Sequence, residues 1–163
     1  MSKKTAYLGL MLALALILSY LERLLPFDFA VPGIKLGLTN IVPLILLYRD
    51  GFKYAFGLNI ARILLANLLF GNIFALTYAL SGGVLSVLAM AISKKTGLFS
   101  ITGVSMIGGT LHNVGQLAAA LIVLRAPALI YYLPLLMVAG LACGLLVGFT
   151  TALVLRRLEK AGL

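Results

Sequence analysis

The sequence predicts an all-α integral membrane protein, a single domain of residues 1–163 that folds as a bundle of six transmembrane helices. Of the 163 residues, 63% are hydrophobic and only 10% are charged, less than half the charged share of an ordinary soluble domain. The apolar residues form continuous Leu- and Ala-rich runs, and about 20 such residues span a hydrocarbon core. Because the runs do not alternate, transmembrane strands are disfavoured. A water-soluble enzyme, a disordered tail and a nucleic-acid-binding module are excluded.

The first three helices are predicted at residues 5–21, 31–48 and 54–70. The first run ends at the polar pair Glu22 and Arg23. The second run begins at residue 31 or 36 and ends before the turn at residues 49–51, and the third is closed by Gly71 and Asn72. Glycine, proline and polar residues at these positions interrupt the apolar pattern, as expected between helices.

The last three helices are predicted at residues 73–92, 99–124 and 129–155. The fourth is followed by Lys94 and Lys95, and the fifth ends at the Arg-Ala-Pro sequence of residues 125–127. The sixth begins near Leu129 or at Pro134 and ends before two arginines.

The distribution of basic residues predicts a cytoplasmic N-terminus and a cytoplasmic C-terminus. With that orientation nine of the 13 basic residues are inside and three are outside, as the positive-inside rule requires. The net charge of +9 therefore indicates contact with an anionic lipid bilayer rather than with nucleic acid. The start of the chain also resembles a secretory signal, but no small-residue cleavage site follows, so we expect the first helix to be retained. The inside residues are Lys3, Lys4, Arg49, Lys53, Lys94, Lys95, Arg156, Arg157 and Lys160, and the outside residues are Arg23, Lys35 and Arg125.

Small residues form a stripe on two of the predicted helices. In the last helix Gly140, Gly144 and Gly148 recur at a spacing of four, and in the first Gly9 and Ala13 do the same. Such stripes allow close helix packing in membranes. They indicate packing within the bundle or contact with a partner subunit.

Polar residues at membrane depth predict a binding cavity. Arg62 follows Lys53 by nine residues, which places it about 13 Å from the inner surface, and Asn59 shares its helix face. His112 and Gln116 lie on one face of the fifth helix, with Asn113 adjacent.

The second predicted helix adds Lys35 at its outer end and Asn40 near its proline. Convergent polar groups in an apolar bundle are typical of a ligand cavity. Because the nearby charges are mainly positive, an anionic or strongly hydrogen-bonding ligand is favoured over a cation. The alternatives are structural: Asn and Gln often join helices, His112 can satisfy a core neighbour, and Arg62 can be neutralised by backbone carbonyls or an unseen contact. The glycines at residues 82 and 83 allow a kink or the close approach of a ligand.

Several catalytic patterns are missing from the sequence. It has no G-x-x-x-x-G-K-[ST] phosphate loop, and its two Asp and two Glu are too few to form a clustered carboxylate site for magnesium. We therefore expect no enzyme activity, cofactor or metal in this chain. If transport is active, we expect a partner to supply the energy.

Residues 31–43, with the sequence VPGIKLGLTNIVP, resemble the family called Gx transporters, which carries the older label heptaprenyl diphosphate synthase component I. The likeness extends over nearly the whole chain and includes Arg62, the glycines at 82 and 83, and His112. This resemblance implies similarity to the substrate-binding S components of energy-coupling-factor (ECF) transporters, six-helix proteins of the bacterial plasma membrane. Those proteins capture vitamins or related small molecules from outside.

The resemblance also implies partners, namely a transmembrane T component and two ATPase subunits. Many S components dock on the T component through an Ala-x-x-x-Ala pattern in the first helix. This chain has Gly9 and Ala13 at that spacing, a small-residue equivalent that departs from the pattern.

Three functions remain open at this point. The first is capture of a small polar or anionic molecule for import, with Lys35, Asn40, Arg62, His112 and Gln116 in contact with it. The second is an accessory role in isoprenoid or quinone metabolism, with a prenyl diphosphate as ligand. The third is a structural assembly role without a ligand.

Overall fold

The computed structural model describes residues 3–24 and 37–162, and this part of the chain contains helices and turns without a β-strand. The elements in order are α1 (Lys3–Leu24), the 3₁₀ turn η1 (Leu38–Asn40), α2 (Ile41–Arg49), α3 (Phe52–Phe70), α4 (Ile73–Thr96), α5 (Ile101–Leu124), the 3₁₀ segment η2 (Pro127–Tyr132) and α6 (Leu133–Lys160).

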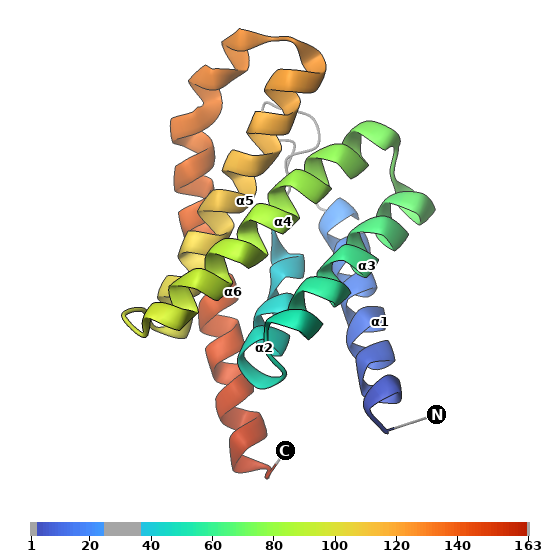
Figure 1. Cartoon of the computed structure of the whole chain (residues 1–163), viewed down its shortest axis with the longest axis vertical. Helices are drawn as coiled ribbons and strands as arrows, with labels where there is room; N and C mark the ends of the chain where they lie inside the picture. The colour runs from blue at the N-terminus through green and yellow to red at the C-terminus, as the bar shows by residue number, and fades with distance from the viewer. Residues whose placement is uncertain (1–2, 25–36, 163) are drawn as a thin grey trace.

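The prediction of an all-α membrane bundle is confirmed. Within the described residues, five helices are long and apolar enough to cross a membrane, and one apolar helix is shorter. The long helices run up and down between two ends of the molecule, and the N- and C-termini lie at the same end (Figure 1).

The second predicted helix, at residues 31–48, is wrong in its extent. Among the described residues the helical structure here begins at Leu38, and one continuous helix through residue 37 is excluded because Gly37 has a φ of 82°, in the left-handed region that a right-handed helix cannot continue through. Residues 31–36 lie outside the described residues. The 3 residues of η1 and the 9 of α2 extend about 18 Å, well short of a hydrocarbon core of ~30 Å.

The bounds of several other helices differ from the predicted ones. α1 continues through Glu22 to Leu24 because polar partners inside the bundle receive the charged end of the helix, as described below. α4 continues to Thr96, where the Nζ of Lys94 donates a hydrogen bond of 2.7 Å to the Leu47 carbonyl at the end of α2. The side chain of Ser100 caps α5 by accepting a hydrogen bond from the Gly103 amide, so α5 begins two residues later than predicted.

α6 does not begin near Leu129, the first of its two predicted starting positions. Residues Pro127–Tyr132 form η2, and α6 begins at Leu133, one residue before the alternative position at Pro134. The helix then runs to Lys160, beyond the predicted end at residue 155.

Helix α5 packs tightly between α4 and α6. A Cβ added at Gly144 of α6 would lie 2.6 Å from the Cα of Met106, and one added at Gly148 would lie 2.6 Å from the Cα of Thr102. A Cβ at Gly140 would likewise lie 2.7 Å from the Gly109 carbonyl oxygen. The glycine stripe of α6 is therefore used for packing within the bundle.

The Ser-Gly-Gly sequence at residues 81–83 also serves helix packing. α4 continues through it without interruption. Ser81 donates a 2.8 Å hydrogen bond to the Gly115 carbonyl of α5, and a Cβ at Gly82 would lie 2.6 Å from the His112 carbonyl oxygen. Gly82 lets α4 approach the α5 backbone closely, whereas Gly83 faces α3, where an added Cβ would press on Cδ1 of Ile63. Neither a kink nor a ligand contact is required to explain the two glycines.

Helix α1 is less embedded than the others. Its buried residues are Ala15, Ser19 and Glu22, while Gly9 and Ala13 are exposed on its outer surface. A Cβ added at Gly9 would meet nothing within 4 Å. The small-residue stripe of α1 is thus exposed, and Gly9 lines a groove between α1 and α3 together with Tyr54 and Gly57.

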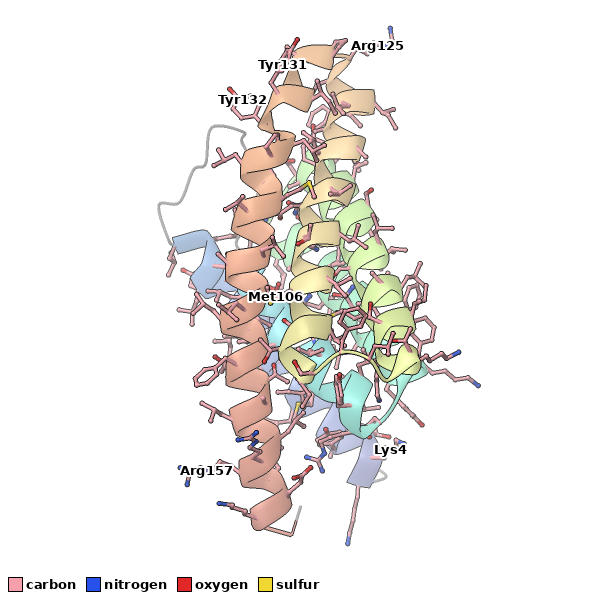
Figure 2. All side chains as sticks on the ribbon, turned by 90° about the vertical axis from the view of Figure 1, so that its left-hand side faces the viewer. Lys4, Met106, Arg125, Tyr131, Tyr132 and Arg157 are labelled. Atoms are coloured by element: carbon pink, nitrogen blue, oxygen red, sulfur yellow. The ribbon has the colours of Figure 1, made fainter. Side chains whose placement is uncertain are left out.

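The two ends of the bundle differ in charge. Lys4 and Arg157 lie at the end that carries both termini, whereas Arg125, Tyr131 and Tyr132 lie at the opposite end (Figure 2). The turn between α2 and α3, with Arg49 and Lys53, and the end of α4 belong to the first end (Figure 1). We call this the basic end.

Candidate functional site

Polar side chains from four elements converge on a small cavity inside the bundle, which we call the central cavity. Its volume is about 10 Å³, which is room for about one water molecule. The polar residues that line it are Ser19 and Glu22 of α1, Thr39 of η1, Arg62 and Asn67 of α3, and His112 and Gln116 of α5. Ala79 of α4 adds an apolar wall.

The guanidinium group of Arg62 is buried, with 6% of the residue exposed, and it points away from lipid. Its Nη1 donates hydrogen bonds to Thr39 Oγ1 at 2.8 Å and to Ser19 Oγ at 3.5 Å. Its Nη2 donates a hydrogen bond of 2.8 Å to Asn59. Polar partners on both sides thus fix the orientation of a charge that lipid would not tolerate.

Glu22 supplies the opposite charge. Its carboxylate is buried and interacts electrostatically with Arg62. It also accepts hydrogen bonds from the backbone amides of Gly37 and Leu38, which join the end of α1 to the start of η1.

The sequence analysis did not predict Glu22 as a site residue, because Glu22 lies at the polar end of the first apolar run. A usable signal was present: Ala15, Ser19 and Glu22 follow one another at spacings of four and three, so they share one helix face. With Glu22 inside, the described part of the cavity contains one positive and one negative side chain. The expectation of a mainly positive site therefore does not hold for the described residues.

His112 and Gln116 form the wall of the central cavity opposite α1. They lie one turn apart on α5 and are 5% and 2% exposed. The close approach of α4 at Gly82 supports this wall from behind, since a Cβ there would lie 2.7 Å from Cγ of Gln116.

Buried atoms on two walls of the central cavity make no hydrogen bond with the described residues. They are Nε of Arg62, which is a donor, and Oε1 of Gln116, which is an acceptor. Buried polar groups of this kind are normally satisfied. A water molecule or a ligand that accepts from Arg62 and donates to Gln116 would satisfy both.

Two of the predicted site residues have packing roles. Asn59, which has no exposed surface, donates a 3.1 Å hydrogen bond to the Gly83 carbonyl of α4 while its oxygen accepts from Arg62. It is therefore a positioning residue for the guanidinium group. Asn113 donates a 2.8 Å hydrogen bond to the Leu136 carbonyl and joins α5 to α6.

The other two predicted residues lie elsewhere. Asn40 is buried beside a second cavity of about 10 Å³, which Ser105 and Cys143 also line. Its Oδ1 has no hydrogen-bond partner among the described residues. Lys35 lies outside the described residues. The structure thus brings Arg62, His112 and Gln116 together, with Asn59 behind Arg62.

The described residues do not form a metal-binding site of the usual kind. Within residues 3–24 and 37–162, no three His, Cys, Asp or Glu side chains lie close enough together to hold a metal ion.

A protein-family model described as heptaprenyl diphosphate synthase component I matches residues 11–154. The match covers most of the chain, and it confirms the resemblance to the family that has this label. Comparisons with curated proteins and with solved structures give no match.

Proposed function

The chain belongs to the heptaprenyl diphosphate synthase component I family, and from this membership we propose that it is the membrane-embedded substrate-binding subunit of an ECF-type importer. In this proposal the chain captures a small polar or anionic molecule, of the vitamin-like kind that ECF importers take up, in the central cavity. The observation that carries the proposal is the pair of unsatisfied atoms, Arg62 Nε and Gln116 Oε1, that meet at one cavity deep in an apolar bundle.

The chemistry of these atoms restricts the ligand. Arg62 requires an acceptor and Gln116 requires a donor, and the low dielectric of the bundle strengthens both hydrogen bonds. Because Glu22 already balances Arg62, a ligand with both kinds of group and little net charge fits the described residues best. A ligand with a single negative charge would compete with Glu22 for Arg62.

Capture requires the central cavity to expand. Its volume of about 10 Å³ is far below the ~300 Å³ of the smaller ligand pockets. α1 contributes Ser19 and Glu22 to the lining, and three of its 22 residues are buried, while its other contacts with the core are made by partly buried apolar side chains. Elements with few buried contacts open most readily, so we propose that α1 moves outward to admit the ligand.

The proposed partners are an ECF T component and two ATPase subunits. The exposed small-residue stripe of α1, with Gly9 and Ala13, supports such an arrangement because it would let a partner helix approach closely. In this proposal the chain itself is not an enzyme and has no cofactor, and the partners supply the energy.

The proposal is tested by identifying the bound molecule and then removing one of its contacts. Native mass spectrometry of protein purified in a mild detergent should show a retained small molecule. Gln116→Leu removes the acceptor without disturbing the charge pair, and we expect it to weaken ligand binding about tenfold, as for a lost buried hydrogen bond.

Thr110→Val is the matched control, because Thr110 lies on the same helix and its hydroxyl bonds only the Met106 carbonyl of its own helix turn. It should leave binding unchanged. Equal affinity of Gln116→Leu and the unchanged protein for the retained molecule would contradict the central cavity as the binding site.

The family description favours a second candidate function. An accessory subunit of isoprenoid or quinone metabolism would bind a prenyl diphosphate, whose tail suits the apolar bundle. A diphosphate in the central cavity would, however, face the carboxylate of Glu22, and like charges at short range repel. Co-purification with a soluble prenyl synthase would favour this function, whereas co-purification with an ATPase would favour import.

A further inference from the structure

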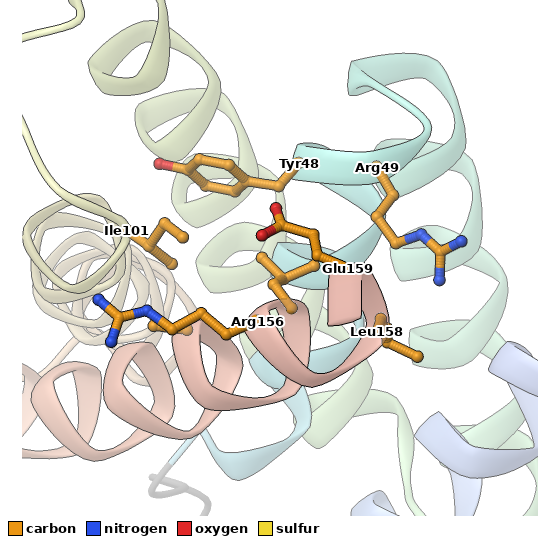
Figure 3. Close-up of a pocket in the computed structure, with 8 residues that line it drawn as sticks. Tyr48, Arg49, Ile101, Arg156, Leu158 and Glu159 are labelled. Carbon is orange, nitrogen blue, oxygen red and sulfur yellow. The ribbon is translucent and has the colours of Figure 1, made fainter. Parts of the chain in front are cut away.

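A larger pocket lies at the basic end, away from the central cavity. Its volume is about 330 Å³. The end of α2 supplies Tyr48 and Arg49, the start of α5 supplies Ile101, and the last turns of α6 supply Leu155, Arg156 and Glu159 (Figure 3). We call it the interfacial pocket.

The depth of the interfacial pocket matches that of lipid head groups. Leu155 follows Leu133, the first residue of α6, by 22 positions, which corresponds to about 33 Å of helix. A hydrocarbon core is about 30 Å thick. The apolar lining therefore reaches the edge of the core, and Arg156 and Glu159 lie at the level of the head groups.

The polar groups of the pocket carry a small positive net charge. Arg49 and Arg156 lie on opposite flanks, and the carboxylate of Glu159 lies between them below Tyr48 (Figure 3). Two arginines and one glutamate give a net charge of +1, the complement of one phosphodiester. Nearby, the ammonium group of Lys94 lies 4.7 Å from the centre of the Tyr48 ring and adds to the positive surroundings.

We propose that the interfacial pocket binds the head group of an anionic phospholipid of the phosphatidylglycerol type. The guanidinium groups of Arg49 and Arg156 point outward in the structure (Figure 3), and because both side chains are long and exposed, they can turn inward to reach the phosphate from two sides. Glu159 accepts hydrogen bonds from the glycerol hydroxyls, and an acyl chain begins along Ile101 and Leu155. Basic pockets between transmembrane helices are known to bind anionic head groups in this way. The site does not depend on the function of the central cavity.

The test compares two adjacent arginines. Arg156 lines the interfacial pocket, whereas Arg157 is exposed, carries the same charge and lies outside the pocket lining. Each is replaced by Gln, and the protein is placed in phosphatidylcholine nanodiscs with or without phosphatidylglycerol. Retained lipid is counted by native mass spectrometry, and the shift of the unfolding temperature caused by phosphatidylglycerol is measured.

We expect Arg156→Gln to lower the affinity for phosphatidylglycerol about tenfold more than Arg157→Gln does, because general attraction to an anionic surface affects both variants alike. Equal losses in the two variants would overturn the proposal, since they would indicate general attraction without a built pocket. Displacement of the lipid by soluble glycerophosphoglycerol at similar concentrations would also overturn it, since the pocket would then recognise a free phosphate ester.

Discussion

Arg62 and Glu22 place opposite charges in the middle of a protein that is otherwise apolar. The pair is embedded in hydrogen bonds: Thr39, Ser19 and Asn59 accept from the guanidinium group, and two backbone amides donate to the carboxylate. Desolvating two charges is costly, and these hydrogen bonds offset much of that cost, with Nε of Arg62 left without a partner among the described residues. The two residues therefore depend on each other, and α1 depends on both.

Glu22→Gln should destabilise the protein by about 3 kcal/mol, because it leaves the buried charge of Arg62 without its counter-charge. Chemical unfolding in detergent micelles measures the effect. The double variant Glu22→Gln with Arg62→Met removes both charges and should be more stable than Glu22→Gln alone. If the two substitutions instead add independently, the charges are not coupled.

The sequence predicted some members of the site and missed others for clear reasons. Arg62, His112 and Gln116 are conspicuous because polar side chains at membrane depth need a reason to be there. Glu22, Ser19 and Thr39 were missed, because a residue at the end of an apolar run or in a turn shows no such conflict. Asn59 and Asn113 were assigned to the site, yet they bond backbone carbonyls of neighbouring helices, and sequence spacing does not distinguish the two uses.

At the level of elements, α5 is held by backbone contacts on two faces. Gly82 brings α4 against one face, and Gly140, Gly144 and Gly148 bring α6 against the other. The last helix and its glycine stripe were predictable from the spacing of four. The break in the second helix was not, because glycine is common within membrane helices and only the backbone angle of Gly37 distinguishes a break from a continuation.

Gly144→Ala should destabilise the protein by about 1–3 kcal/mol, since the new methyl group would press on the α5 backbone and overpack the contact. The unfolding temperature of the purified protein reports the change. Gly57→Ala is the matched control: a Cβ there meets nothing within 4 Å, and alanine favours the helix by up to ~1 kcal/mol over glycine. Similar destabilisation by both substitutions would contradict the packing role of Gly144.

At the scale of the whole molecule, the basic end fixes the expected orientation in the membrane. The termini and the turns at Arg49 and Lys95 share that end, and the turn at Arg125 lies at the other (Figure 1). Since lysine and arginine near transmembrane ends are retained on the cytoplasmic side, we expect the basic end to face the cytoplasm.

Single cysteines test this orientation in a Cys143→Ser background. Arg125→Cys should react with a membrane-impermeant thiol reagent in intact cells. Lys95→Cys should react only after the cells are permeabilised. The reverse pattern would place the basic end outside and would refute the assigned orientation.

The contrast between the tightly packed α5 and the lightly held α1 has a consequence for how a ligand is recognised. His112 and Gln116 sit on a helix that cannot shift without displacing both of its neighbours, whereas Ser19 and Glu22 sit on one that can. We therefore expect the residues of α5 to determine which ligand binds at equilibrium. The movement of α1 should determine how fast the ligand enters and leaves. Substitutions on α1 would alter how long a ligand stays, while those on α5 would alter which ligand is chosen.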